Sequence, residues 1–303
     1  MSALLDDLRP VAFSVAYRML GSVSEAEDVV QETLLRVHAT LEEGETIESP
    51  RAFAATVATR LSIDALRSAR RRRETYVGEW LPEPIVTGLD DDPALHAELS
   101  DSLSLAFLVL LESLSPEQRA VFLLREVFDY GYGEIAEIVG KSEDNTRQLA
   151  VRARRHVEER RPRFDASREQ RELLADRFFA AAQEGELEAL EALLAEDVEL
   201  YGDGGGKVPA LARVLRGRNR VARTLAAWAR QQRKLQGVTV RRVDVNGQPG
   251  AVVLDAEGRV FSVLALEIGD GRVQSVHSVV NPDKLGHLGP VADVWALLAG
   301  RDR

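Results

Sequence analysis

The sequence contains no cysteine, which excludes disulfides and thiolate metal sites. It also lacks a long hydrophobic run: the longest, LSLAFLVLL from Leu103, is far shorter than the roughly 20 residues that cross a membrane. The first residues carry Asp6 and Asp7 in place of a basic stretch followed by an apolar core. We therefore expect no secretory signal, no membrane partner and a cytoplasmic location.

Acidic residues outnumber basic ones, with 49 Asp and Glu against 39 Lys and Arg, and the net charge is -10. Residues 1–160 hold 18 Lys and Arg against 29 Asp and Glu, whereas residues 161–303 hold 21 against 20. Two basic islands interrupt the acidic half, at 60–73 and 141–163. Such islands in an acidic chain are typical of phosphate contact, although solvated arginine faces on ordinary helices would give the same composition.

Glycine and proline mark the organisation of the first half. Residues 1–76 are predicted to be helical, with Ser24 as an N-cap and Pro50 in the first turn of a further helix. Residues 77–102 contain three prolines and seven acids with no base, which indicates a linker. Helix resumes over 103–161, where Ser115 has the position of an N-cap.

The pattern changes after Arg163. Two helices are expected over 168–197, separated by a Gly break, and alternating strands follow from Val240 to Val280. The Asp270-Gly271 pair between two such runs is a strong hairpin signal. Helices followed by an antiparallel meander predict an α+β domain.

The basic segment 142–157 divides into two faces at helical spacing. Thr146, Ala150, Ala153 and Val157 share one face, and the opposite face is polar and basic. A shorter apolar helix ending at Gly140 precedes it, so the pattern predicts a helix-turn-helix with an exposed reading face. Arg and Gln are residue types that pair with base edges in a major groove.

Three stretches carry a specific resemblance. The segment SPEQRAVFLLREVFDYGYGEIAEIVGKSEDNTRQLAVRARRHV resembles the domain of extracytoplasmic-function sigma factors that reads the -35 promoter element. GSVSEAEDVVQETLLRVHATL resembles their polymerase-binding helix, and SPRAFAATVATRLSIDALRSARRRRE resembles the segment that melts and reads the -10 element. The resemblance implies a promoter-specificity subunit of bacterial RNA polymerase, which is not an enzyme, with promoter DNA and core polymerase as partners.

The resemblance assigns residues to each partner. In the family the first helix docks on the clamp of the largest polymerase subunit, and the -35 reader lies near the flap. The core-binding residues implied are Asp28, Gln31, Glu32 and Leu35. Residues implied at the -10 element are Arg60, Arg67, Arg70, Arg71, Arg72 and Arg73. At the -35 element the resemblance implies Arg147, Gln148, Val151 and Arg152, and the helical projection adds Asn145 and Arg155.

Residues 168–290 resemble the SnoaL-like group of the nuclear-transport-factor-2-like superfamily, a cone formed by a curved antiparallel sheet and helices. Together, WLPEP, DGGGK and NPDKL mark sigma factors with a fused SnoaL-like domain, and we expect these motifs to form a regulatory contact. The residues concerned are Trp80, Leu81, Pro82, Glu83, Pro84, Asp203, Lys207, Asn281, Pro282, Asp283, Lys284 and Leu285.

The C-terminal domain offers little for catalysis. Asp203, Lys207, His277 and Asp283 are the only plausible acid–base groups, and no cluster has metal-ligand spacing. We therefore predict no catalytic residue, no metal and no cofactor, and leave open a small ligand in the pocket. The rival interpretation is a helix-turn-helix ligand sensor or an enzyme fusion.

The predicted fold is multidomain: two all-α sigma domains followed by an α+β SnoaL-like cone. The predicted boundaries are 1–76 for region 2, 77–103 for the linker, 104–163 for region 4, 168–290 for the SnoaL-like domain and 291–303 for the tail.

Overall fold

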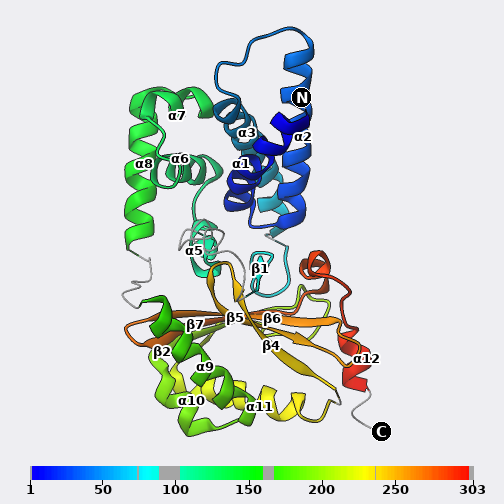
Figure 1. Ribbon diagram of the computed structural model, residues 1–303. Coiled ribbons are helices and arrows are strands. Elements are labelled where there is room, and N and C mark those ends of the chain that lie inside the picture. The colour runs from blue at the N-terminus through cyan, green and yellow to red at the C-terminus, as the bar shows by residue number, and fades with distance from the viewer. Residues whose placement is uncertain (1, 74, 89–102, 160–166, 236, 300–303) are drawn as a thin grey trace. The chain divides into compact units, whose positions relative to one another are not determined.

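The structure is a computed structural model, and it describes residues 2–73, 75–88, 103–159, 167–235 and 237–299 (Figure 1). Contacts divide the chain into two compact units. The helical unit comprises residues 1–75 and 108–161, and the sheet unit comprises residues 76–107 and 162–303. The described part of the predicted linker, 77–103, therefore makes its contacts within the sheet unit.

Three long helices form the first part of the helical unit: α1 (Ser2–Leu20), α2 (Val23–Glu42) and α3 (Pro50–Arg73). Leu8, Val37 and Ala54 form a buried cluster among them. The N-cap of α2 is Ser22, whose hydroxyl accepts a hydrogen bond from the Glu25 amide at 3.2 Å. The prediction of Ser24 as the cap is wrong, because the chain is extended at residue 22 and already helical at residue 24.

The second part of the helical unit contains shorter helices: α5 (Leu105–Leu111, shared with the sheet unit), α6 (Pro116–Glu126), α7 (Tyr132–Val139) and α8 (Glu143–Glu158). Ser115 caps α6, as the sequence predicts, and the structure adds a capping box with Gln118. Gly140 ends α7 at φ 65°, a left-handed conformation that glycine adopts without steric cost. The short turn that follows leads directly into α8, which gives the predicted helix-turn-helix (Figure 1).

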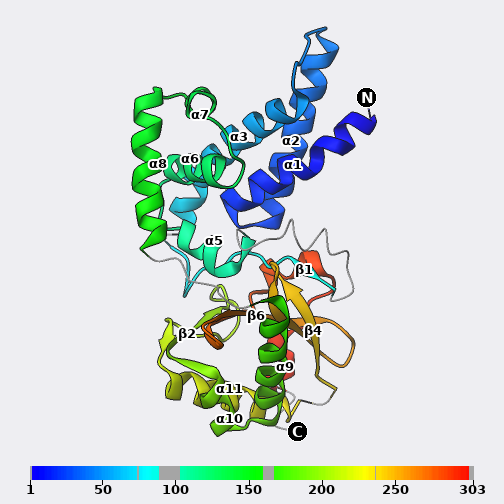
Figure 2. The same cartoon turned by 60° about the vertical axis from the view of Figure 1, so that its left-hand side comes forward.

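In the described part of the sheet unit, the further α-helices are α9 (Arg168–Glu184), α10 (Leu187–Leu193), α11 (Arg218–Gln232) and α12 (Val294–Ala299). Gly185, at φ 66°, separates α9 from α10 at the predicted break. Figure 2 shows α9, α10 and α11 gathered beside the strands.

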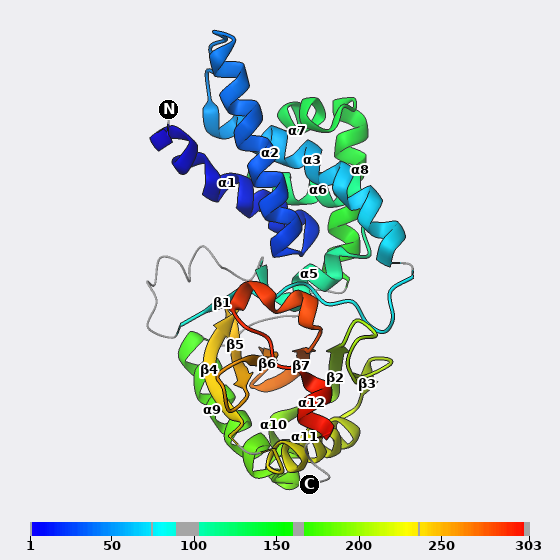
Figure 3. The same cartoon turned by 90° about the vertical axis from the view of Figure 1, so that its right-hand side faces the viewer.

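Seven strands form one sheet in the order β1-β4-β5-β6-β7-β2-β3 (Figure 3). Their bounds are Val86–Thr87 (β1), Leu194–Asp203 (β2), Leu215–Arg216 (β3), Thr239–Val245 (β4), Gln248–Leu254 (β5), Val260–Gly269 (β6) and Arg272–Val279 (β7). The Asp270-Gly271 turn joins β6 to β7 as predicted, with both residues at positive φ.

The expectation of a purely antiparallel sheet requires a correction. β2 and β7 run parallel, with Gly202 beside Ser278 and Asp203 beside Val279, so the sheet is mixed. A parallel pair needs a long crossover connection, and the chain between these two strands contains α11 and four other strands of the sheet. The alternation within β2 does not reveal which strand it will join.

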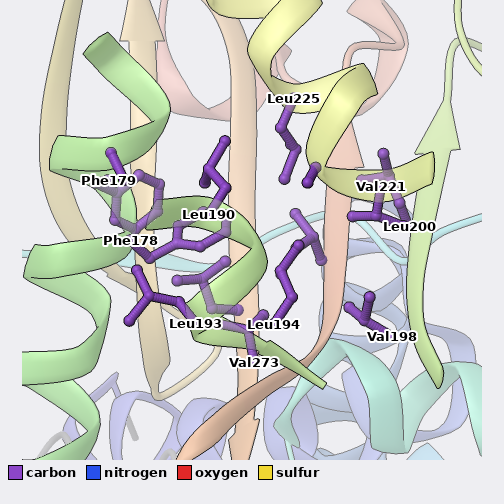
Figure 4. Packing of buried hydrophobic residues seen from close by; sticks show 14 of the residues in the cluster. Phe178, Phe179, Leu190, Leu193, Leu194, Val198, Leu200, Val221, Leu225 and Val273 are labelled. Atoms are coloured by element: carbon purple, nitrogen blue, oxygen red, sulfur yellow. The ribbon is translucent and has the colours of Figure 1, made fainter. Parts of the chain in front are cut away.

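One apolar cluster holds the sheet unit together (Figure 4). Phe178 of α9, Leu190 of α10 and Leu225 of α11 pack with Val273 of β7. Each fully buried side chain of this size contributes roughly 1.5–3 kcal/mol. This packing holds β2 and β7, whose ends lead into the DGGGK and NPDKL motifs.

Candidate nucleic-acid interface and linker-binding site

Helix α8, predicted to read the -35 element, has one buried face and one exposed face. Thr146, Ala150, Ala153 and Val157 are all buried, as the helical projection predicts. Ala150 belongs to a core cluster with residues of α6 and α7. The six residues predicted at the -35 element are all exposed: Asn145, Arg147, Gln148, Val151, Arg152 and Arg155.

Two of these arginines are positioned by neighbours in the helical unit. The Arg147 guanidinium pairs with Glu143 one turn earlier and lies 4.6 Å from the centre of the Tyr132 ring. Arg155 donates to Glu159 at 2.9 Å. Val151 is 66% exposed, which is unusual for an apolar side chain on a helix with a complete core face. The exposed face therefore combines hydrogen-bond donors with an apolar contact point, the combination that reads base edges.

The arginines predicted at the -10 element make contacts within the helical unit. Arg60 donates to the backbone carbonyls of Ile138 at 3.0 Å and Glu137 at 2.9 Å, at the end of α7. Arg67 donates to Glu117 of α6 at 2.6 Å and to Asp64 of its own helix at 3.0 Å. The side chains of Arg70, Arg71, Arg72 and Arg73 lie outside the described residues.

The ion pair between Arg67 and Glu117 shifts the pKa of both side chains. The hydrogen bond from Arg67 holds the pKa of the Glu117 carboxyl below its usual value, and the bond to Glu117 raises the pKa of Arg67. Both groups are therefore charged at neutral pH, and the pair links α3 to α6. Sequence reasoning did not identify this link, because the two residues lie 50 positions apart.

The predicted polymerase-binding residues lie on one side of α2. Asp28 and Gln31 are exposed, Glu32 is half-buried, and Leu35 is 62% exposed. Glu32 accepts a hydrogen bond from Arg36 at 2.7 Å. An exposed leucine beside two carboxylates forms a mixed apolar and acidic surface, which suits a protein partner better than DNA.

Asp203, at the end of β2, is the first residue of the DGGGK motif and is fully buried. Its carboxylate accepts hydrogen bonds from the Tyr76 hydroxyl at 2.5 Å, the Leu81 amide at 2.8 Å and the Gly205 amide at 3.0 Å. The Lys284 ammonium completes this shell at 2.6 Å. We call Tyr76, Leu81, Asp203, Asn281 and Lys284 the Asp203 cluster.

The other members of the Asp203 cluster are also connected to one another. Lys284 donates to the Leu81 carbonyl and lies 4.1 Å from the centre of the Trp80 ring. Asn281 donates to the Tyr76 hydroxyl at 2.8 Å. Burial, together with the hydrogen bond to Asp203, raises the pKa of Tyr76 far above its usual value, so the phenol remains neutral.

The motifs WLPEP, DGGGK and NPDKL therefore meet in the structure. Leu81 and Glu83 are buried, as are Asn281, Lys284 and Leu285. Lys207 and Asp283 form a separate pair at 2.5 Å, with side chains 53% and 61% exposed. Further members of the predicted set are Pro82 and Pro84, which are buried, and Trp80 and Pro282, which are half-buried.

The glycines of DGGGK allow this close approach. A Cβ on Gly205 would collide with the Asn281 amide, and one on Gly206 would lie 3.0 Å from Val77 of the linker. Both glycines have positive φ, at 60° and 71°. A side chain at either position would force the linker or the NPDKL turn to move.

The linker also binds elsewhere on the sheet. β1 pairs with β4, and the Ile85 amide donates to the Asn246 side chain at 2.9 Å. The Asn246 amide group donates to the Leu103 carbonyl, and a His287 ring nitrogen lies 2.8 Å from the Pro84 carbonyl.

Sequence reasoning missed Tyr76, Asn246 and His287 as linker contacts. Asn246 belongs to an Asn-Gly pair, which predicts only a turn. Tyr76 lies at the predicted domain boundary, where an aromatic residue next to a linker is a weak indication of docking.

The remaining acid–base candidate is His277 on β7. It is buried, it stacks on Tyr201 with ring centres 4.7 Å apart, and burial lowers its pKa to about 3. The imidazole is thus neutral and packed. Among the described residues, no group of three or more His, Asp or Glu side chains is placed to hold a metal ion. None of the described helices combines the length and the apolar character that a membrane-spanning helix needs.

Family models match three segments of the chain. Sigma-70 region 2 matches residues 4–72, Sigma-70 region 4 matches residues 104–157, and a SnoaL-like domain matches residues 175–284.

Curated relatives match over nearly the whole chain. The ECF RNA polymerase sigma factor SigJ of Mycobacterium tuberculosis is 39% identical over 98% of this chain and 96% of its own length. The probable ECF RNA polymerase sigma factor SigI of the same species is 32% identical over 92% of this chain and 93% of its own. The crystal structure of Mycobacterium tuberculosis SigJ superposes with a TM-score of 0.77, covering 94% of this chain and 98% of that one at 36% identity.

Proposed function

Because the chain belongs to the extracytoplasmic-function sigma factors of RNA polymerase, it acts in promoter-specific transcription initiation, and we propose that its SnoaL-like domain controls that activity in cis. The observation that carries this proposal is the Asp203 cluster, in which a buried carboxylate and a buried ammonium bind both sides of Leu81 in the linker. The linker joins the region that reads the -10 element to the region that reads the -35 element. A domain that binds the linker therefore controls how freely these two regions can adjust to a promoter.

The residue roles follow from exposure and chemistry. The exposed face of α8 contacts the -35 element, with Arg152 and Gln148 reading base edges and Arg155 reaching phosphate. The acidic and apolar side of α2, centred on Glu32 and Leu35, docks on the clamp of the largest polymerase subunit, while the region containing α8 lies near the flap. The protein acts where polymerase and chromosome are found, in the cytoplasm.

The arginines of α3 need to leave their present partners before they contact the -10 element. Arg60 is bound to carbonyls at the end of α7 and Arg67 to Glu117 of α6. A guanidinium cannot satisfy these acceptors and a phosphate with the same hydrogen atoms. We take the described arrangement of the helical unit as a closed state, which opens when polymerase and promoter bind.

The SnoaL-like domain works in this account as a regulator and not as a catalyst. Asp203, its most buried carboxylate, is fully engaged with four donors, and His277 is neutral and packed. The rival account, an enzyme or ligand sensor with a helix-turn-helix, gives no role to the acidic and apolar side of α2.

The proposal is tested by binding and transcription with core polymerase. Full-length protein and chains ending after residue 165 or residue 280 are compared in a pull-down with core enzyme and in run-off transcription. We expect all three to bind core enzyme, and the chain ending after residue 280, which lacks Lys284, to transcribe more strongly than the full-length protein. Equal transcription with unchanged promoter choice from all three chains would refute control in cis.

A further inference from the structure

The sheet unit contains a cavity of about 250 Å³. Trp228 of α11 and Leu235, just beyond that helix, form one side, and Phe261 and Leu264 of β6 form another. These four side chains are only partly buried, although they are large and apolar. A dry apolar cavity of about 150 Å³ already holds benzene, so this one has room for a molecule of roughly ten non-hydrogen atoms.

The lining is uncharged and carries a few polar groups. No Asp, Glu, Lys, Arg or His is among the described residues that line the cavity. Ser262 and Ser278 contribute hydroxyl groups from the sheet and are 3% and 5% exposed, while Gln231 and Gln232 contribute amides from the end of α11. Neither serine hydroxyl forms a side-chain hydrogen bond within the described chain.

This chemistry restricts the ligand class. Both serines line the cavity, so a ligand atom that accepts or donates a hydrogen bond would be favoured near their hydroxyl groups. An ionised ligand would lose its hydration and find no opposite charge in the lining. The lining thus suits a neutral, mainly apolar molecule with one or two polar atoms.

The walls of the cavity continue directly into the Asp203 cluster. Gly202 and Ser278 line the cavity side by side on β2 and β7, and Asp203 follows Gly202 in the chain. Val280 also lines the cavity, and its amide donates to the Asp203 carbonyl at 2.9 Å. The Asn281 amide donates to the same carbonyl at 2.9 Å.

The opposite rim of the cavity is tied to the DGGGK loop. Val294 of α12 lines the cavity, and the indole of Trp295 donates to the Lys207 carbonyl at 2.8 Å. Leu211 approaches Gly202 so closely that a Cβ there would lie 3.1 Å from the Leu211 amide nitrogen. Widening the cavity between Leu211 and Val294 would therefore displace the loop that precedes Leu211.

From this geometry we propose that the cavity binds a small, neutral, mainly apolar molecule and that its occupancy alters the hold of the Asp203 cluster on the linker. The second part rests on the control in cis proposed above. In this account the SnoaL-like domain is a sensor whose ligand tunes promoter-dependent transcription.

Binding is tested with full-length protein and a matched pair of probes. Isothermal titration calorimetry compares 4-propylphenol, which is neutral, with 4-propylbenzoate, which has the same propylphenyl body and a negatively charged carboxylate in place of the hydroxyl. We expect the phenol to bind with one site per chain and the benzoate to bind at least tenfold more weakly. Ser262→Phe, which fills the cavity from β6, is expected to weaken phenol binding at least tenfold. The proposed site would be refuted if the phenol shows no saturable binding, or if phenol and benzoate bind equally well. This result does not depend on whether Ser262→Phe folds.

Coupling is tested by run-off transcription with core polymerase at a saturating concentration of 4-propylphenol. We expect the phenol to change the output of the unsubstituted protein at least threefold and to leave the output of Ser262→Phe unaltered. Saturable binding without a change in transcription would overturn the coupling. A parallel Lys284→Met variant separates the two proposals. Altered basal transcription by that variant would support control in cis even if the phenol has no effect. Basal transcription equal to that of the unsubstituted protein would count against control in cis itself.

Discussion

The Lys284 ammonium lies 2.6 Å from a carboxylate oxygen of Asp203, with the two side chains 7% and 0% exposed. The ammonium also donates to the Leu81 carbonyl, while the carboxylate accepts from the Leu81 amide. One buried ion pair therefore binds both backbone polar groups of a linker residue. The chain contains a second Lys–Asp pair between the same motifs, Lys207 with Asp283, which is exposed to solvent.

Lys284→Met is expected to destabilise the sheet unit by roughly 3–5 kcal/mol, because Asp203 would remain buried without its counter-charge. Lys207→Met makes the same change at the exposed pair and should cost about 0–1 kcal/mol. Urea unfolding monitored by tryptophan fluorescence compares the two variants. Equal losses of stability would show that burial of the pair is unimportant.

Arg152→Ala should weaken recognition of the -35 element by about 1–3 kcal/mol and leave core polymerase binding intact. Arg152 is exposed on the face of α8 that we propose contacts the -35 element. Arg154→Ala is the matched control, since Arg154 lies on the same helix and pairs with Glu126. Binding is measured with native and scrambled -35 duplexes. An equal loss on both duplexes would indicate a phosphate contact in place of base reading.

The double substitution Asp28→Lys and Glu32→Lys should weaken core polymerase binding at least tenfold, because it reverses the charge of the docking side of α2. Circular dichroism should be unchanged, since neither side chain is part of the buried core. Glu188→Lys, on the exposed surface of α10, controls for a simple change in net charge. Normal competition by the double variant for core enzyme would place the docking surface elsewhere.

Glu117→Gln should strengthen binding of single-stranded -10 DNA by up to about fivefold, the range of an exposed ion pair, because it releases Arg67. Since Arg67 lowers the pKa of Glu117, the stabilisation from this pair is complete above pH 4.5 and is lost as the pH falls through the lowered value. Glu27→Gln, which breaks the Arg9–Glu27 pair within region 2, is the control. An unchanged affinity in both variants would mean that Arg67 does not limit access to the -10 element.

The sequence was sufficient for features that depend on local periodicity or on specific motifs. The buried stripe on α8 follows from helical spacing, and the left-handed Gly140 follows from its place between two helices. The meeting of WLPEP with NPDKL could be expected because Trp80 and Leu81 beside two prolines are unusual in an acidic linker and indicate a docking site.

Features that depend on tertiary contacts could not be predicted. The parallel pairing of β2 with β7 joins strands separated by about 70 residues, and neither strand indicates its partner. Arg60 was interpreted from its charge as a DNA contact, whereas its present acceptors are two carbonyls 77 and 78 positions away. The central role of Asp203 arises only where three separate motifs converge.

Run-off transcription from a native promoter with Lys284→Met and Lys207→Met, each with reconstituted core polymerase, tests the central claim most directly. The account predicts that Lys284→Met, which releases the linker from the buried pair, changes the yield of specific transcript at least threefold, while Lys207→Met matches the unsubstituted protein. Identical yields from all three proteins, at equal core polymerase occupancy, would contradict control of the sigma factor by its SnoaL-like domain through the Asp203 cluster.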